Sequence, residues 1–473
     1  MKTNEDFIDE LDSPDWALAE FAPASLGDRR LNRRLSAIAG DFARHPGAPI
    51  TQACQSHERI EGAYRFLENE AVEPEQIMLG HRQASLRRLA REPVVLAPQD
   101  TTTFNFGEWP ATQGLGPVGS DDHPKAQGLW LHSTLAFTPA GLPLGLVAGQ
   151  FWARSQPPVA GQRRAEPEAE KESARWRQGW TACQQALNQQ SRLNLWVNIA
   201  DMEGDIYEVF AAALAQPAPR VELLIRSRHD RPLTDQEHRL WEHLAGQPLA
   251  GELQVRVPRH EGRPARLARL QIRFCAAEVQ APRSQPDPSP LTLWAVEARE
   301  LHPPRGVRPI RWRLVSTLPV TTAGEAIEKV RWYTVRWGIE VFHKIVKNIC
   351  RAEDHQLETA LRLERALMID LVVAWRIQLL TQVGRQNPDL PACDYFAESE
   401  WKALHCFIQH SRAVPKQAPR LGDMMEDIGR LGGFVKGKST PHPGPLTLAR
   451  GLARLNDLAR MWAIQNGGEN CEE

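Results

Sequence analysis

Residues 93–106, PVVLAPQDTTTFNF, begin a series of apolar segments that decides the fold. Two further strand-like segments follow, LWLHSTLAF at 129–137 and LPLGLVAGQFW at 142–152, and they are typical of a hairpin. A helix-like segment at 171–187, KESARWRQGWTACQQAL, precedes an apolar strand at 194–201, NLWVNIAD. The sequence therefore predicts three strands, a helix and a further strand in the middle of an α/β protein.

The next two segments complete the order of elements. A helix is predicted at 204–215, GDIYEVFAAALA, and another strand at 220–228, RVELLIRSR. Three strands, a helix, a strand, a helix and a strand is the order of an RNase H-like (retroviral-integrase-like) domain. We therefore predict an α/β protein with such a core.

Short alternating segments separated by Pro, Gly and Ser occupy residues 233–316, and they predict a mostly antiparallel β insertion. A long helix is expected from about 323 to 352, and helices with loops after it. We predict three parts: a helical N-terminal domain at 1–75, the core with its insertion at 76–365, and a helical C-terminal domain at 366–473.

Composition limits the class of protein. The chain has 473 residues, 42% of them hydrophobic, which is enough for several domains. No segment approaches the roughly 18 consecutive apolar residues of a membrane helix, and the acidic start does not resemble a secretory signal. The seven cysteines form no C-x-x-C pair, so a cytoplasmic protein with reduced thiols and no membrane contact is expected. The net charge of −1 means that any nucleic-acid surface must be local.

One local basic surface is predicted near the N-terminus. The segment 26–45, LGDRRLNRRLSAIAGDFARH, carries leucine and other apolar side chains at helical spacing, with arginines largely on the other faces. This pattern indicates a helix with a basic outer side, either to bind a partner or simply to face solvent.

A second basic face lies on the long helix, in EKVRWYTVRWGIEVFHKIVKN at 328–348. Helical geometry places four side chains within an arc of about 60°, with two at its border and one just beyond. They are Tyr333, Arg336, Glu340 and Lys347, then Trp337 and Lys344, then His343. Cations and aromatic rings beside a lone acid favour a site for phosphodiester chemistry, and the alternative is an exposed helix with solubilising bases.

Two aspartates at strand ends supply possible partners for this acid. Asp100 follows VVLAPQ and Asp201 follows LWVNIA. Either alone is equally typical of a turn or helix cap. Together with Glu340 they could converge on two Mg²⁺ ions that activate a water or 3′-hydroxyl and stabilise the leaving oxygen.

The helix matches the pattern Y-x2-R-x3-E-x6-K, and in this the chain resembles the insertion-sequence family four of DDE transposases. The resemblance extends over nearly the whole chain. It includes EGAYRF at 61–66, QDTTTFNF at 99–106, ADMEGDIYE at 200–208, IRSRH at 225–229 and RLGGF at 430–434. At His45 the family has an aromatic phenol, and the match is loose around His57 and Glu58.

The resemblance implies a role for each matching residue. Asp100, Asp201 and Glu340 become the catalytic, metal-binding triad for two Mg²⁺ ions, with Mn²⁺ as a substitute. Trp312 would stack on a flipped base, as displaced bases require. The resemblance also implies DNA contacts on the long helix, namely Tyr333, Arg336, Trp337, His343, Lys344 and Lys347. It further implies that Arg226 and Arg228 lie beside a hairpin formed by the DNA, and that Arg34, Arg44 and Arg65 lie in the N-terminal part that recognises the DNA ends.

The activity implied is that of a cut-and-paste transposase. Such an enzyme binds the inverted-repeat ends of a double-stranded transposon, cleaves them through a DNA hairpin, and transfers the 3′-hydroxyl ends into target DNA. The N-terminal domain would recognise the ends and the C-terminal domain would form a homodimer. Two alternatives remain: a transposase-derived inhibitor that binds DNA without cutting it, and an RNase H-like nuclease.

Overall fold

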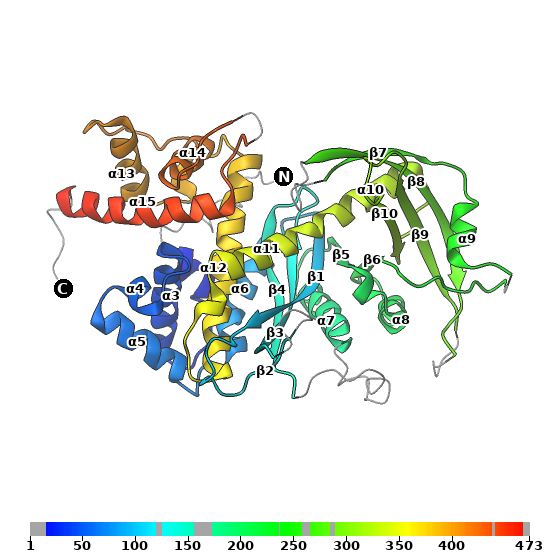
Figure 1. Ribbon diagram of the computed structural model, residues 1–473, viewed down its shortest axis with the longest axis horizontal. Coiled ribbons are helices and arrows are strands. Elements are labelled where there is room, and N and C mark those ends of the chain that lie inside the picture. The colour runs from blue at the N-terminus through cyan, green and yellow to red at the C-terminus, as the bar shows by residue number, and fades with distance from the viewer. Residues whose placement is uncertain are drawn as a thin grey trace.

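The computed structural model describes residues 16–119, 125–155, 173–235, 237–257, 265–283, 289–437 and 440–466. The acidic segment before Trp16 lies outside the described residues. Figure 1 shows a helical half, which contains both ends of the described chain, beside a half built on one large twisted sheet. The sheet positions the site, so it is described first.

Five strands form the centre of the sheet in the order β4-β3-β1-β5-β6. They are β1 (Val94–Asn105), β3 (Gln127–Phe137), β4 (Pro143–Trp152), β5 (Leu195–Ala200) and β6 (Glu222–Arg226). β1, β3 and β4 are antiparallel, whereas β1, β5 and β6 are parallel. Parallel neighbours need crossover connections, and α7 (Ala174–Asn188) and α8 (Tyr207–Ala215) occupy them. All five strands and both helices confirm the elements predicted from the sequence.

The insertion after β6 extends the same sheet. Its elements are α9 (Leu240–Ala245), β7 (Gly251–Val257), β8 (Arg266–Val279), β9 (Leu291–Glu300) and β10 (Arg311–Ser316). Its strands pair antiparallel with one another, as predicted, and β10 also pairs antiparallel with β6. The two-residue strand β2 (Gly116–Pro117) pairs with β3 at the other side of the sheet.

The long helix predicted at about 323–352 is two helices. α10 (Ala323–Val335) begins at a capping box formed by Thr322 and Glu325, and α11 (Trp337–Asn348) continues beyond Arg336. The backbone N–H of Arg336 donates to the carbonyl of Tyr333, three residues earlier, so the helix tightens there. The prediction of one helix was therefore wrong at this junction and at the end, where Arg351 adopts a positive φ of 49°.

Helices from the two ends of the chain surround one long central helix, α12 (Ala360–Gln386) (Figure 1). The N-terminal ones are α2 (Trp16–Phe21), α3 (Arg29–Arg44), α4 (Ile50–Cys54), α5 (His57–Glu68) and α6 (Pro74–Leu89). The C-terminal ones are α13 (Glu398–Gln409), α14 (Leu421–Leu431) and α15 (Pro445–Asn466). One continuous apolar cluster joins these helices to β1, β3, β4 and α11, so the predicted parts share a core.

By length and composition alone, α12 is the one helix among the described residues that could cross a membrane. In this fold 89% of its apolar window is buried inside the protein. The Arg365 guanidinium donates to the carbonyls of Leu67 and Val72, and the Trp375 indole donates to that of Pro143. These bonds join α12 to the N-terminal helices and to β4, so α12 is a core helix here.

A buried ionic cluster attaches α2 to the rest of the molecule. The Glu20 carboxylate lies 2.6 Å from both Arg88 Nη1 and His81 Nδ1. Because a carboxylate only accepts, Nδ1 of His81 donates, and its Nε2 accepts the backbone N–H of Leu146 on β4 at 3.0 Å. Burial opposes ionisation of Glu20, but Arg88 and His81 outweigh it and lower its pKa to about 2. A charged Glu20 therefore connects α2, α6 and β4.

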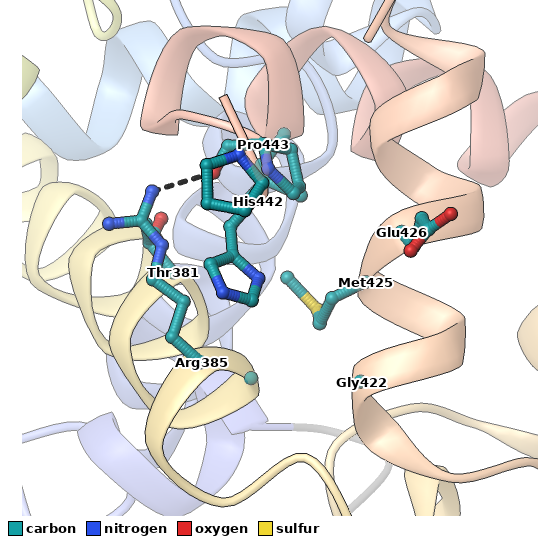
Figure 2. Close-up of a pocket in the computed structure, with 10 residues that line it drawn as sticks. Thr381, Arg385, Gly422, Met425, Glu426, His442 and Pro443 are labelled. Carbon is teal, nitrogen blue, oxygen red and sulfur yellow. Dashed lines mark hydrogen bonds between the residues drawn. The ribbon is translucent and has the colours of Figure 1, made fainter. Parts of the chain in front are cut away.

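The C-terminal helices enclose a small cavity of about 30 Å³ between α12, α14 and the segment before α15 (Figure 2). The Arg385 guanidinium donates to the Pro443 carbonyl at 2.7 Å and so fastens that segment to α12. Met425 and His442 also line the cavity. It is large enough for about one or two water molecules and too small for an organic ligand.

Candidate active site

Sheet geometry brings the two predicted aspartates together. β1 and β5 are parallel, and Pro98 is paired with Ile199. Continuing this register by two positions places Asp100 beside Asp201 at the carboxyl end of β5. Asp201 also accepts the backbone N–H of Glu203 at 2.9 Å, so it caps the short 3₁₀ turn Met202–Gly204. The two carboxylates therefore lie on adjacent strands, far apart in sequence.

α11 brings the third acid to the same place, because it packs over β1 and β3 through an apolar side. Arg336 lies between the acids: its Nη1 is 3.3 Å from Asp100 Oδ2, and its Nη2 donates to Glu340 Oε1. All three side chains are partly buried. One guanidinium therefore links an acid of the sheet to an acid of the helix.

The acids influence one another electrostatically. The pKa of Asp100 is raised to about 6, mainly by burial, and Asp201 and Glu340 raise it further. Arg336 acts in the opposite direction. Burial lowers the pKa of Arg336, but Tyr333, Glu340, Asp100 and Asp201 outweigh it, so the pKa is raised and the guanidinium stays charged. The negative charge of the acids therefore converges here, and the Arg336 guanidinium is the cation that opposes it.

The oxygen ligands present suit Mg²⁺, which binds carboxylates in phosphoryl-transfer sites. As the side chains stand, however, the described part of the chain has no group of three or more His, Cys, Asp or Glu residues placed to hold a metal ion. In this arrangement Arg336 pairs with an oxygen of Asp100 and with one of Glu340.

Three of the predicted DNA-binding residues form a second cluster beside Arg336. Trp312 on β10 meets Tyr333 on α10 edge to face, with ring centroids 5.4 Å apart. Burial raises the pKa of the Tyr333 phenol, and the nearby Arg336 and Arg226 on β6 act in the opposite direction. The Arg336 guanidinium is 6.0 Å from the Tyr333 ring. Trp312 is half-buried and Tyr333 is buried, so Tyr333 supports Trp312 from inside.

The remaining predicted residues of α11 lie along its more exposed side. Trp337 is exposed, and Lys344 Nζ lies 5.1 Å from the centre of its ring. Lys347 is half-buried, with Nζ 5.7 Å from the Phe104 ring. Burial lowers the pKa of Lys347, while Glu353 acts against that shift. Arg228, after β6, is exposed.

His343 differs from its neighbours. It was predicted as a DNA contact at the edge of the basic face, but it is buried, and its Nε2 lies 2.8 Å from Ser133 Oγ on β3. Burial, with Lys347 and His132 nearby, lowers its pKa to about 3, so the imidazole is neutral. The prediction placed it only slightly outside the face, and the sheet covers that side of the helix. This placement argues against DNA contact.

The predicted end-recognition residues lie in the helical half, on α3 and α5. Arg34 crosses from α3 onto Gly62 of α5, where an added Cβ would lie 2.3 Å from its Nη1. Arg44 pairs with Asp41 at 2.5 Å, and the exposed Arg65 pairs with Glu61 at 2.5 Å. α3 confirms the predicted helix, with Asp28 as its N-cap. These arginines form a surface separate from the acid cluster.

Sequence analysis missed a chain of buried polar side chains beneath the acids. His132 on β3 bonds through Nε2 to Gln99 Oε1 at 3.0 Å, and through Nδ1 to the Thr101 hydroxyl at 2.8 Å. The Gln99 amide donates to Asn198 Oδ1, and Asn198 donates to the carbonyl of Ala97. An amide oxygen only accepts, so His132 carries its proton on Nε2 and Thr101 donates to Nδ1.

This chain of bonds joins β3, β1 and β5 next to Asp100 and Asp201. Burial, with Arg175 nearby, lowers the pKa of His132 to about 3, so the imidazole is neutral, as the bonding pattern requires. The signal in the sequence was the presence of Gln99, His132 and Asn198 within otherwise apolar strands. We regard these residues as supports of the site.

Replacing Asn198 with Leu is expected to lower the free energy of unfolding by about 1–3 kcal/mol, because the Gln99 amide and the Ala97 carbonyl lose a buried partner. Urea unfolding of the wild type and the variant would measure this. The control is a double-mutant cycle with Gln99→Leu. The double variant should lose less stability than the sum of the two single losses, because each single substitution breaks the same bond. Full additivity would show that the bond is not shared.

The two ends of the chain match known families. The family model Transposase DNA-binding matches residues 13–72, which include α2 to α5. The model Transposase Tn5 dimerisation domain matches residues 372–461, from within α12 into α15. The acidic cluster on the mixed sheet lies between these two matches, both of which are to transposase families. Together the matches support a Tn5-like transposase.

The DNA-binding match makes the arginines of α3 and α5 testable. Replacing Arg65 with Ala should weaken DNA-end binding for all sequences and reduce the salt dependence of log K by about one unit of slope, as expected for one lost phosphate contact. Gel shifts over a range of KCl would measure it. Arg430→Ala is the matched control, because Arg430 pairs with Glu426 four residues away, as Arg65 does with Glu61. If the slope of log K against log[KCl] were the same for both variants, Arg65 would not be a phosphate contact.

Proposed function

We propose that this chain is a cut-and-paste DNA transposase in which Asp100, Asp201 and Glu340 are the catalytic carboxylates. The observation that carries the proposal is that one guanidinium, Arg336, joins Asp100 of β1 to Glu340 of α11 beside Asp201, which follows β5, between the DNA-binding and dimerisation matches. It would bind the inverted-repeat ends of a transposon, cut them, and join the 3′-hydroxyl ends to target DNA.

The strand order supports an RNase H-like core. Three antiparallel strands, β4, β3 and β1, are followed across the sheet by β5 and β6 parallel to β1. In an α/β sheet, ligands bind beyond the carboxyl ends of parallel strands. Asp201 lies at such an end and Asp100 lies beside it, which is the position expected of catalytic acids in this fold.

Asp100, Asp201 and Glu340 would hold Mg²⁺, or Mn²⁺ in its place, and two ions would supply an activated water and a counter-charge for the leaving oxygen. Before DNA enters, Arg336 neutralises Asp100 and Glu340. We infer that a DNA phosphate draws Arg336 away, since a guanidinium binds phosphate as readily as carboxylate. The same movement opens both carboxylates to the metal.

The other side chains would hold and orient the DNA. Lys344 and Lys347 on α11 would contact phosphates, and Trp337 would pack on the sugar or on an unpaired base. For hairpin formation, Trp312 would stack on the flipped base while Tyr333, with Arg226 next to it, supports the indole from behind. Arg228 would lie beside the hairpin.

The partners would be two transposon ends and a second copy of the chain. The family of the C-terminal match supports a homodimer, and the N-terminal match supports contact with DNA. We further propose that the protein works in the cytoplasm on the bacterial nucleoid.

The deciding experiment gives the full-length chain a DNA fragment with both flanking inverted repeats, a target plasmid and Mg²⁺. Hairpin ends, excised fragment and joined product are expected, with Mn²⁺ also effective. Binding without cleavage in either metal would instead indicate a transposase-derived inhibitor. Cleavage without joining would indicate a nuclease, and either result would overturn the proposal.

A further inference from the structure

The helix that carries Glu340 must be held at a fixed height along the sheet. α11 packs on β1 and β3 with apolar side chains, namely Ile339, Phe342, Ile345 and Val346. Apolar contacts are not directional and tolerate small sliding movements. Each residue of a helix advances it by about 1.5 Å, so a shift of even part of one residue would move the carboxylate relative to the strands.

One buried polar bond of α11 reaches the strand next to Asp100. Ser133 on β3 is the direct cross-strand partner of Asp100 on β1, so the two side chains lie on the same face of the sheet. The Ser133 hydroxyl is bonded to His343 Nε2 at 2.8 Å. His343 follows Glu340 by three residues, which places the two on neighbouring turns of one side of the helix.

The two partners are suited to a permanent bond. Ser133 is fully buried and His343 is 7% exposed. A hydroxyl both donates and accepts, so Ser133 satisfies Nε2 of the neutral imidazole in either tautomer. Breaking the bond would leave polar atoms buried without a partner, which is costly.

At the start of α11 the fit is also close. A Cβ on Gly338 would lie 2.8 Å from the Phe137 ring, and Gln378 of α12 donates to the Gly338 carbonyl at 2.8 Å. These contacts hold the beginning of the helix against β3 and α12. The bond of His343 lies on the other side of Glu340 along the chain, so the acid is held between two fixed points.

We propose that His343, bonded to Ser133, is a positioning residue that sets the distance between Glu340 on α11 and Asp100 on β1. The inference rests on the proposed function, in which Glu340 and Asp100 act together as catalytic carboxylates of one site. His343 touches neither DNA nor metal in this role. It acts through the register between helix and sheet, as partners behind metal ligands commonly do.

The test compares Ser133→Ala and His343→Leu with His343→Gln, whose amide can replace Nε2 as a partner of the hydroxyl. Mn²⁺ affinity is measured by the electron paramagnetic resonance of free Mn²⁺, with end DNA present and absent. Single-turnover cleavage and DNA-end affinity are measured in parallel. Ser133→Ala and His343→Leu should lower Mn²⁺ affinity or cleavage rate by about 10- to 100-fold, with end affinity unchanged. His343→Gln should recover most of the loss.

The control for loss of a buried hydroxyl is Ser316→Ala on β10, because Ser316 is also fully buried and donates to the Leu223 carbonyl at 2.9 Å. It should lower the melting temperature without changing Mn²⁺ affinity or cleavage. The inference is overturned if Ser133→Ala behaves as the wild type does, or if Ser316→Ala causes the same loss. If the wild type itself neither binds Mn²⁺ nor cuts, the proposed function fails, and that result is distinct.

Discussion

Replacing Glu340 with Gln is expected to lower the rate of DNA-end cleavage by about 10³-fold or more, while end binding persists. The amide keeps the size of the side chain but removes the charge that would hold a metal ion. Metal ions contribute several kcal/mol to such transition states, and each 1.4 kcal/mol is about tenfold in rate. Single-turnover cleavage of an end duplex in Mg²⁺ and in Mn²⁺ would measure the loss.

Glu328→Gln is the matched control, since Glu328 is a more exposed acid on α10 that pairs with Lys329. It should cut at nearly the wild-type rate. Asp100→Asn and Asp201→Asn should resemble Glu340→Gln, because the three acids would act on the same ions. If Glu340→Gln cut DNA ends at a rate within tenfold of the wild type, Glu340 would not be a catalytic residue.

Replacing Glu20 with Gln is expected to lower the free energy of unfolding by about 3–5 kcal/mol, the loss typical when one partner of a buried ion pair is removed. Arg88 and His81 would remain buried, and both would lose the carboxylate with which they pair. Guanidinium unfolding at pH 7 would measure the change. Glu61→Gln is the control, because the exposed pair of Glu61 with Arg65 should contribute only about 0–1 kcal/mol.

The Glu20 carboxyl should also make the stability of the protein depend on pH. The pKa of Glu20 is about 2 in the folded protein, whereas an unperturbed glutamate has a pKa of 4.5, so the folded state favours the ionised form. Its stabilising contribution is complete above pH 4.5 and is lost as the pH falls towards 2. The difference in stability between wild type and Glu20→Gln should shrink over that window. A difference that stays constant would show that Glu20 is not ionised in the fold.

Much of the candidate site could be predicted because local sequence patterns indicate the strands and the helix that hold its residues. The apolar strand before Asp201 placed this acid at a strand end, and helical periodicity placed Arg336 and Glu340 on one face. The prediction that Asp100 also ends a strand was wrong, because β1 continues past it to Asn105 through pairing with β3. The antiparallel insertion also followed from alternation. These features depend on residues near one another in the sequence, where period and turn residues are informative.

Other features depended on contacts between distant segments. Periodicity placed His343 near the basic face, but only the packing of α11 on β3 shows that this side chain is buried against Ser133. The break at Arg336 likewise has no signal in the composition of the helix. The continuity of the insertion with the central sheet depends on the pairing of β10 with β6, which no local pattern specifies.

The three carboxylates illustrate this division. The sequence by itself determined their chemical type, the elements that carry them and the basic and aromatic residues on the same helix, because these follow from residue identity and spacing. Only the tertiary structure decided that Asp100 lies beside Asp201, that Arg336 joins Asp100 to Glu340, and that Ser133 receives His343. The physical reason is that strand register and helix packing minimise the free energy of the whole chain, in which burial of distant apolar surfaces outweighs local preference.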